Sequence, residues 1–217
     1  MKGHRWFAAT YDLLMRPGDS VLAPVRQFVA GGASGLVLEV GCGTGANLPY
    51  YDWERVESLD ATEPDPFMLQ RARRRASKLP PSARVTFHEA PAEALPFPDA
   101  TFDTVVFSLV LCTVDDVEKS LAEVKRVLKG DGVLRLVEHV RGEGLMGRFQ
   151  DAIQPAWGWC AAGCHPNRRT AEAVRAAGFR LDVERRFSLT LGAPAFVGLA
   201  RLAPAERPRV GNGAAKE

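Results

Sequence analysis

The chain has 217 residues, of which 46% are hydrophobic, and it carries a net charge of +2 at pH 7. This length suits one domain with a full hydrophobic core, and the small net charge argues against a polyanionic partner such as nucleic acid. The arginine-rich run at residues 71–75 is interpreted as a solvated helix face, because no aromatic residues alternate with its charges.

Near the N-terminus, residues 10–30 show a broken helical pattern of apolar residues. Pro17-Gly18 interrupts this pattern and Gly31-Gly32 ends it. The segment is too short and too polar to cross a bilayer, so no integral membrane association is expected. We predict that residues 1–34 form helices that act as a lid over the site of a single domain at residues 1–202.

The most informative stretch is an apolar strand pattern at residues 36–40 that ends on Gly41, Gly43 and Gly45. Glycines at the carboxyl end of a strand let the backbone turn tightly and lie directly against a ligand. Glu63 ends the next apolar segment, and an acid about 20 residues past such a loop binds the hydroxyl groups of a ribose. The sequence therefore predicts a site for a nucleoside-containing cofactor, with helix capping as the alternative role of Glu63.

Two features distinguish between possible nucleoside cofactors. Gly41, Gly43 and Ala46 also fit the fingerprint of an NAD-binding loop. However, Glu39 would repel a pyrophosphate and attract an ammonium group, and Pro49 would cut short the helix that normally faces a diphosphate. A ligand with a ribose and a cationic amino-acid end fits better, and S-adenosylmethionine is such a ligand.

The rest of the chain alternates between strand and helix patterns. A helix is expected at residues 115–128, closed by Gly130, and another at residues 170–177. From Ala203 to residue 217, Pro, Gly, Ala and charged residues predict a disordered tail. This alternation favours an α/β fold with a parallel sheet covered on both faces. The further strand candidates are residues 56–62, 84–88, 102–108, 133–138, 179–187 and 195–201.

Several motifs, in order along residues 36–140, resemble the class I S-adenosylmethionine-dependent methyltransferases of the methyltransferase type 11 family. They are residues 38–45, 63–69, 92–97 and 102–106. Residues 109–114, 138–140 and 163–168 further resemble a subgroup of small bacterial methyltransferases and animal alkyl-thiol methyltransferases. The resemblance implies a Rossmann-like sheet of seven mostly parallel strands, the last antiparallel. It also implies cofactor contacts at Glu39, Gly41, Cys42, Gly43, Thr44, Gly45, Asn47, Glu63, Pro64, Met68, Ala92, Glu93, Ser108 and Leu109.

One position departs from the family pattern. Relatives commonly place an acid that accepts the adenine amino group where this chain has Pro91. The backbone of Ala92 is therefore expected to meet the adenine ring, with Glu93 either assisting or facing solvent. Ser108 and Leu109 end the fourth strand, where the resemblance places backbone carbonyl groups near the reactive methyl group.

His139 is the candidate catalytic residue. It follows Glu138 at the end of the fifth strand, and a histidine can remove a proton from a thiol, amine or enol near neutral pH. The alternative is that His139 holds the end of the strand by packing and hydrogen bonding. His165, in a loop before the last helix, is a weaker candidate.

The cysteines are expected to be reduced. No C-x-x-C pair and no signal peptide are found, which favours a cytoplasmic setting. Cys160, Cys164 and His165 raise the question of a zinc site. No fourth ligand follows at a plausible spacing, so we predict no metal and interpret these cysteines as packing residues.

Residues 145–162 are apolar and aromatic and lie in an insertion at residues 141–170. They are interpreted either as core or as the wall of an acceptor pocket. The predicted function is methyl transfer to a small, largely apolar acceptor, with a thiol as the leading choice. Alternatives are a phospholipid headgroup or quinol as acceptor, an NAD-dependent oxidoreductase, or a non-catalytic cofactor-binding protein. A monomer or homodimer is expected.

Overall fold

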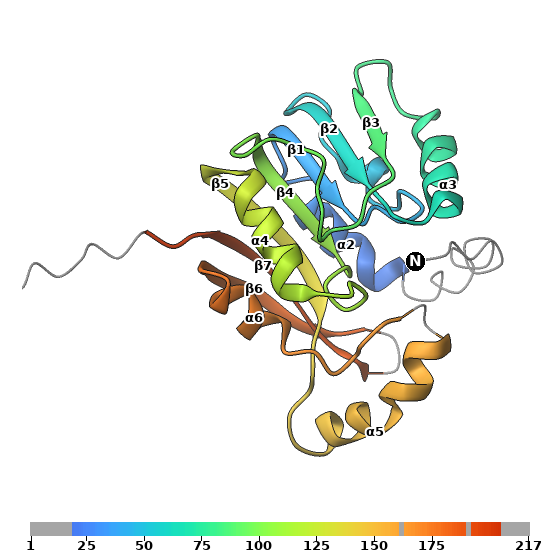
Figure 1. Cartoon of the computed structure of the whole chain (residues 1–217). Coiled ribbons are helices and arrows are strands. Elements are labelled where there is room, and N and C mark those ends of the chain that lie inside the picture. Colours follow the sequence, from blue (N-terminus) through green and yellow to red (C-terminus); the bar gives the residue numbers. More distant parts are fainter. Residues whose placement is uncertain (1–18, 161–162, 190–191, 205–217) are drawn as a thin grey trace, which may run out of the picture.

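The computed structural model describes residues 19–160, 163–189 and 192–204. Its centre is a seven-stranded sheet in the order β3-β2-β1-β4-β5-β7-β6 (Figure 1). β1 to β5 are parallel, whereas β7 is antiparallel to both β5 and β6. The predicted fold class is thereby confirmed. The strands are β1 (Gly35–Val40), β2 (Val56–Thr62), β3 (Val85–His88), β4 (Phe102–Ser108), β5 (Leu128–His139), β6 (Phe179–Ser188) and β7 (Pro194–Leu202).

The central strands are apolar on both faces, which explains why they are buried in the middle of the sheet. In β1, Val37 packs into one hydrophobic cluster and Leu38 into another, and Val106 and Val105 of β4 divide in the same way. Successive residues of a strand point to opposite faces, so these two clusters are the cores above and below the sheet.

Helices cover both faces of the sheet, as Figure 1 shows. Leu121 and Val124 of α4 and Val174 of α6 belong to one core, while Val25 and Val29 of α2 belong to the other. In addition, α5 stands apart from the other helices, beyond the carboxyl end of β5. The helices are α2 (Asp19–Val29), α3 (Pro66–Ala76), α4 (Val117–Val127), α5 (Gly144–Cys160) and α6 (Thr170–Ala176).

The junction between α4 and β5 differs from the sequence prediction. The helix ends at Val127, one residue before its expected limit, but no loop follows: Leu128 already belongs to β5, where it pairs with Phe102. Leu128 is 2% exposed, so burial of this side chain draws the residue into the sheet. The register then shifts before Thr104 pairs with Val133, which is the point where we expected the strand to begin.

The predicted lid is described only from Asp19 onward. There, the second half of α2 packs against the sheet, and Arg135 of β5 donates hydrogen bonds to the carbonyl oxygens of Phe28 and Val29. Residues 1–18, and the predicted disordered tail after Pro204, lie outside the described residues. Among the helices that are described, none has both the length and the apolar character needed to cross a membrane.

Candidate active site

The order of the strands reverses between β1 and β4, whose neighbours on the other side are β2 and β5. In an open parallel sheet, the chains leaving such a pair of strands diverge and open a crevice at the carboxyl ends. The glycine loop follows β1, Glu63 follows β2, Ser108 and Leu109 lie at the end of β4, and His139 ends β5. The structure therefore brings most of the predicted site residues to this one edge.

The three glycines of the loop differ in their surroundings. A Cβ atom at Gly41 would come within 2.9 Å of Val110, and one at Gly45 within 2.7 Å of Leu48. At Gly43, by contrast, a Cβ would meet nothing within 4 Å, and φ is +55°. Gly41 and Gly45 thus allow close packing inside the protein, whereas Gly43 exposes its backbone to open space. A cofactor can lie there directly against the main chain.

The carboxylate of Glu63 lies next to this open backbone. Its Oε2 accepts a hydrogen bond from the amide of Gly43 at 2.9 Å, and its Oε1 accepts one from the amide of Asp65 at 3.0 Å. Burial raises the pKa of Glu63, although these two amides oppose the shift. Each carboxylate oxygen can accept a second hydrogen bond, so both remain able to bind ribose hydroxyl groups. Asp65, rather than Glu63, caps α3 through the amides of Phe67 and Met68.

Glu39 lies beneath the loop and is only 1% exposed. Its two oxygens accept hydrogen bonds from Asn47 Nδ2 at 2.8 Å and from the Tyr51 hydroxyl at 3.0 Å. Burial raises the pKa of Glu39 to about 7, against the influence of Asn47, Tyr51 and Arg26. The other amide atom of Asn47, Oδ1, is buried without a hydrogen-bond partner among the described residues. This unpaired acceptor is suited to the ammonium group of an amino-acid ligand.

Pro49 has the predicted effect on the connection after the loop. Instead of an α-helix, only a short 3-10 helix, η2 (Leu48–Tyr50), precedes β2. α3 supports the loop from the other side, because Arg75 donates hydrogen bonds to the carbonyl and hydroxyl oxygens of Thr44. Cys42 is buried in a small cluster with Ala61, Leu69 and Ala72 of β2 and α3. Pro64 is half-buried and Met68 is buried at the start of α3.

On the expected adenine side, Ala92 is buried and Glu93 is half-buried. Glu93 Oε1 accepts hydrogen bonds from the amides of Asp115 and Asp116, at 2.8 and 3.1 Å. The side chain therefore links the loop after β3 to the start of α4. The sequence allowed Glu93 either to assist the cofactor or to face solvent, and in the structure its side chain is hydrogen-bonded within the protein.

Leu109, directly after β4, has a φ of +61°. This left-handed conformation is rare for a bulky residue, and such outliers concentrate at functional sites. The amide of Leu109 donates to the Val137 carbonyl at 2.8 Å, which holds the turn against β5. The strained residue thus lies where the resemblance places the reactive methyl group.

Glu138 holds the turn after β4 and was not among the predicted site residues. It is fully buried, and its Oε1 accepts hydrogen bonds from the amides of Val110 and Leu111, at 2.8 and 3.0 Å. Burial raises its pKa to about 7, opposed by these amides. A glutamate amid apolar residues at the end of a central strand was the available signal, because a buried carboxylate requires hydrogen-bond donors.

His139 does not stand alone. Its Nε2 lies 3.2 Å from Cys164 Sγ, and these two atoms and Cys112 Sγ all lie within 4.8 Å of one another. A hydrogen bond with Cys112 and another with His139 lower the pKa of Cys164 to about 4. Burial lowers the pKa of His139, but the hydrogen bond to Cys164 and the negative charge of the Cys164 thiolate raise it, so that the pKa lies above its ordinary value. We call Cys112, His139 and Cys164 the acceptor-side cluster.

The cluster differs from the grouping considered in the sequence. Cys164 meets Cys112 and His139 rather than His165, and the side chain of Cys160 lies outside the described part of the chain. His165 contributes its backbone amide, which donates to the Cys112 carbonyl at 2.7 Å. Cys112 was not a predicted site residue, because only the pairing of the chain around β4 and β5 brings it beside His139.

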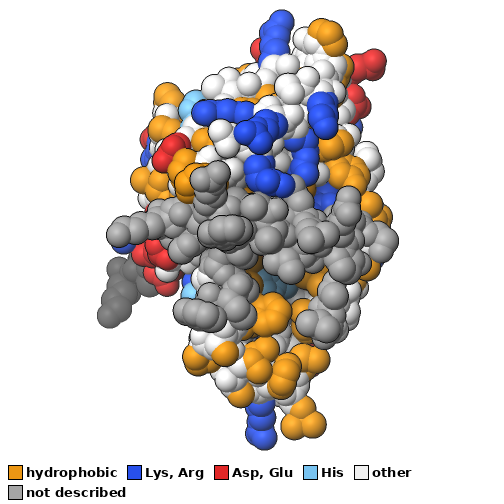
Figure 2. Space-filling model, turned by 90° about the vertical axis from the view of Figure 1, so that its right-hand side faces the viewer, with side chains coloured by type: hydrophobic (Ala, Val, Ile, Leu, Met, Phe, Trp, Pro, Cys, Tyr) orange, Lys and Arg blue, Asp and Glu red, His pale blue; other side chains and the backbone are white. Residues whose placement is uncertain are grey.

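The apolar side chains of α5 are largely exposed rather than part of the core. Leu145 is 81% exposed and Phe149 is 59% exposed. Figure 2 shows the side of the molecule that lies on the right in Figure 1. Hydrophobic side chains gather over its lower part, and Lys and Arg side chains over its upper part. Trp157, further along α5, is among the groups whose hydrogen bonds lower the pKa of Cys164. The helix therefore offers an apolar surface that reaches the acceptor-side cluster.

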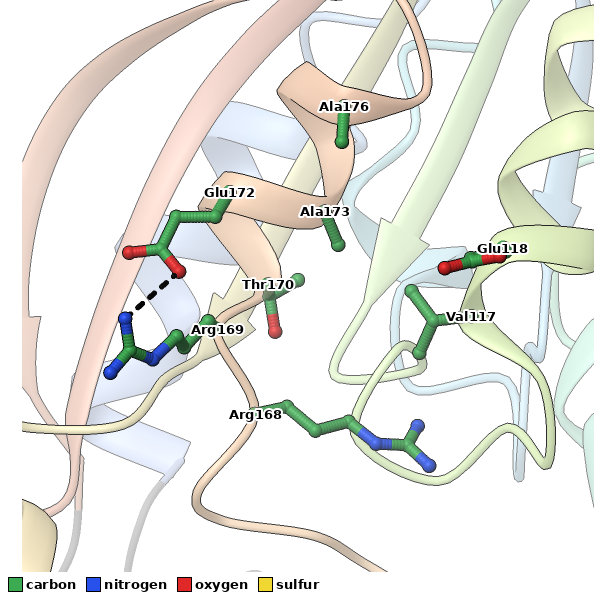
Figure 3. Close-up of a pocket in the computed structure, with 8 residues that line it drawn as sticks. All are labelled: Val117, Glu118, Arg168, Arg169, Thr170, Glu172, Ala173 and Ala176. Atoms are coloured by element: carbon green, nitrogen blue, oxygen red, sulfur yellow. Dashed lines mark ion pairs between the residues drawn. The ribbon is translucent and has the colours of Figure 1, made fainter.

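A pocket of about 410 Å³ lies between α4 and α6 (Figure 3). An ion pair of 3.6 Å between Arg169 and Glu172 borders it. No residue of the glycine loop lines this pocket, so it is separate from the predicted cofactor site. The lining residues are Val117, Glu118, Arg168, Arg169, Thr170, Glu172, Ala173 and Ala176.

Comparison with known proteins identifies the family. A family model described as a methyltransferase domain matches residues 38–136. Human thiol S-methyltransferase TMT1A is 31% identical over 185 residues, which cover 80% of this chain and 72% of that protein. The chain belongs to the S-adenosylmethionine-dependent methyltransferases. S-adenosylmethionine is accordingly its cofactor, and the predicted family and enzyme class are confirmed.

Two further relatives are named for different acceptors, a thiol and a phospholipid. Human thiol S-methyltransferase TMT1B is 36% identical over 71% of this chain and 65% of that protein. Phosphatidylethanolamine N-methyltransferase of Cereibacter sphaeroides is 33% identical over 69% of this chain and 72% of that protein. The chain thus matches roughly two thirds to three quarters of these proteins' length, which leaves part of each without a counterpart.

Solved structures agree on the fold. A methyltransferase of Thermotoga maritima, described as a possible histamine N-methyltransferase, has a TM-score of 0.67 at 23% identity and covers 93% of this chain and 100% of that chain. The complex of DhpI with SAH has a TM-score of 0.66 at 22% identity and covers 92% of this chain and 93% of that chain.

Gly43→Ala should weaken binding of S-adenosylhomocysteine about tenfold or more, since forcing a methyl group into a packed contact costs about 1–3 kcal/mol. Gly144→Ala is the matched control: its φ is also +55° and its Cβ also meets nothing within 4 Å, so it suffers similar backbone strain. Calorimetric titration of both variants separates the two effects. Equal affinities would contradict a cofactor at Gly43.

Glu39→Gln should stabilise the unliganded protein above pH 7 by about 1–3 kcal/mol. The folded-state pKa of about 7 lies above the ordinary 4.5, so the wild type loses stability as pH rises between these values. Below about pH 4.5 the difference should vanish. The same variant should bind S-adenosylhomocysteine more weakly, because the charge that attracts the ammonium group is gone.

Denaturant unfolding from pH 4 to pH 8 measures the first effect and calorimetry the second. Glu57→Gln, at an exposed position of β2, is the control and should change neither. A stability difference that does not depend on pH would show that Glu39 is not protonated preferentially in the fold.

Proposed function

We propose that this methyltransferase transfers its methyl group to the sulfur of a small, largely apolar thiol. The observation that carries this proposal is the acceptor-side cluster, where His139 Nε2 and the Cys112 thiol converge on a sulfur atom, Cys164 Sγ. Groups that already lie around one sulfur atom of the protein can also contact the sulfur atom of a bound thiol. The two human relatives named as thiol S-methyltransferases support the same choice.

The cofactor half of the site is assigned to the loops after β1, β2 and β3. Glu63 would accept the ribose hydroxyl groups, the backbone of Gly43 would lie against the ligand, and Asn47 Oδ1 would accept from the ammonium group. Ala92 would border the adenine ring. The surroundings fit S-adenosylmethionine because they offer one paired carboxylate, one open stretch of backbone and one unpaired buried acceptor. The bound cofactor supplies an electrophilic methyl group on a sulfonium sulfur.

The acceptor half is assigned to the ends of β4 and β5. Ser108 pairs with Val137 in the sheet, so the turn that begins at Leu109 and the end of β5 are neighbours. His139 is proposed to serve the acceptor and to help it reach the thiolate form. Little assistance is needed, because a thiol has an ordinary pKa of about 8.5. Correct alignment of the sulfur and the methyl group then supplies most of the catalysis.

A phospholipid headgroup or a quinol is the second candidate acceptor. The exposed apolar residues of α5 and the relative named as a phosphatidylethanolamine N-methyltransferase favour it. The family assignment leaves no role for an NAD-dependent oxidoreductase.

A panel of thiols, amines, phenols and quinols, incubated with enzyme and methyl-labelled cofactor, should label small apolar thiols most rapidly. Thiophenol and phenol form a matched pair, since they differ only in the accepting atom. Preferential labelling of phosphatidylethanolamine or of a quinol, with no label on any thiol, would contradict the thiol assignment.

His139→Gln should lower kcat for the best acceptor about 100-fold, the usual contribution of a group that assists proton transfer. Affinity for S-adenosylhomocysteine should stay nearly unchanged, because His139 belongs to the acceptor half. His88→Gln, at the end of β3, is the control and should keep kcat. A fall of less than threefold for His139→Gln would assign His139 a structural role.

A further inference from the structure

We propose that Cys112, His139 and Cys164 bind a zinc ion whose fourth position receives the acceptor sulfur. This inference rests on the proposed thiol acceptor and adds to it a metal that holds and activates that thiol. Zinc prefers cysteine and histidine ligands, and catalytic zinc sites combine three protein ligands with one open position. Two cysteines and one histidine form such a set.

The three ligand atoms are close to the spacing that zinc requires. With Zn–S bonds of about 2.3 Å and Zn–N bonds of about 2.0 Å, ligands at tetrahedral corners lie roughly 3.5–3.8 Å apart. Cys164 Sγ and His139 Nε2 are 3.2 Å apart, and all three ligand atoms lie within 4.8 Å of one another. Side-chain movements of less than about 1 Å would bring them onto one ion, so no rearrangement of the fold is needed.

Hydrogen bonds to the backbone hold the ligand segments in place. Arg168 donates to the carbonyl oxygens of Leu111 and Val114, on either side of the turn that carries Cys112. The amide of His165, next to Cys164, donates to the Cys112 carbonyl. Glu138, next to His139, accepts from two amides of the same turn. The three segments are therefore fixed to one another, as a preorganised metal site requires.

Gln150 of α5 strengthens this framework from the acceptor side. It is 3% exposed, donates to the carbonyl oxygens of Val140 and Pro166, and accepts from the amide of Gly142. The Gln150 side chain thus joins the segment after His139 to the segment after Cys164. These buried hydrogen bonds hold the two segments more firmly than contacts at the surface would.

The position of the cluster suits a metal that acts on the acceptor. The Cys112 thiol donates to the Leu109 carbonyl at 3.4 Å, so the cluster contacts the residue expected beside the reactive methyl group. Cys164 is half-buried, whereas Cys112 and His139 are buried. Cys164 is therefore the member of the cluster nearest to solvent, and it also interacts with Trp157 of α5.

Zinc coordination would replace proton removal by His139, because a metal-bound Nε2 has no lone pair left to accept a proton and His139 then serves the acceptor as a ligand. The thiol R–SH would bind the metal as R–S⁻ and release its proton to solvent, because a coordinating thiol is deprotonated outright. The sulfur lone pair would then form a bond to the methyl carbon as the sulfonium S–CH₃ bond breaks. The electron pair of that broken bond stays on the cofactor sulfur. The products are R–S–CH₃, a poor zinc ligand that leaves, and neutral S-adenosylhomocysteine.

Metal content is the first test. Protein purified in zinc-containing buffer and dialysed should retain about one zinc per chain by elemental analysis. Cys112→Ser, Cys164→Ser and His139→Gln should each lose most of it, while Cys42→Ser, which removes a buried cysteine outside the cluster, should keep it. Circular dichroism identifies any variant that fails to fold. Wild-type protein without zinc, or with a Cys112–Cys164 disulfide in its place, would overturn the proposal.

Cobalt substitution is the second test, and it does not depend on turnover. The Co²⁺ protein should show a thiolate-to-cobalt charge-transfer band and tetrahedral visible bands. Thiophenol should shift these bands, whereas phenol should not. Unshifted bands would mean a purely structural metal and overturn the role in activation. Thiol methylation is measured separately with labelled cofactor, so failure of the proposed function and failure of the metal site give different results.

Discussion

Buried carboxylates at the ends of the strands organise this site. Glu39, Glu63 and Glu138 lie at the carboxyl ends of β1, β2 and β5, and none is more than 9% exposed. Burial of a carboxylate is costly unless donors satisfy it. Here the donors are the glycine loop and its neighbours for Glu39 and Glu63, and the turn after β4 for Oε1 of Glu138, whose Oε2 has no partner among the described residues. Each loop of the crevice is thereby tied to a strand of the rigid sheet.

This arrangement also explains why the two halves of the site can be assigned separately. Glu63 and Glu39 hold the loops on the β1 and β2 side, where an open glycine and an unpaired amide oxygen suit the cofactor. Glu138 holds the turn on the β4 and β5 side, where two cysteines and a histidine converge. Leu109 lies between them in a strained conformation. The firm fixing of the surrounding turn is what allows that strain to persist.

The sequence predicted the sheet well because apolar runs in a parallel sheet are strong signals. Apart from the start of β5, each expected strand lies within one residue of the observed limits, and Pro49 prevented a helix as expected. The spacing of about 20 residues between the glycine loop and Glu63 also predicted that Glu63 lies beside the loop. Features that depend on a local sequence pattern could therefore be predicted from the sequence.

The residues of the acceptor half could not be predicted from local sequence patterns. Cys164 is 25 residues from His139, and Cys112 belongs to a different strand connection. Only the pairing of β4 with β5 and the return of the chain after α5 bring them together. Tertiary burial likewise decided the start of β5, because Leu128 is buried in the sheet five residues before the expected start at residue 133. The hydrogen bonds of Glu93 and Glu138 to amides far away in the sequence could not be predicted from residue spacing either.

We infer that the cofactor's reactive end and the acceptor-side cluster face each other across Leu109. A crystal structure of the complex with S-adenosylhomocysteine would show whether they do. The ribose should lie on Glu63 and the sulfur beside Leu109, directed toward Cys164 and His139. A cofactor sulfur directed instead toward α3, away from Cys112, His139 and Cys164, would exclude these three residues from the acceptor site.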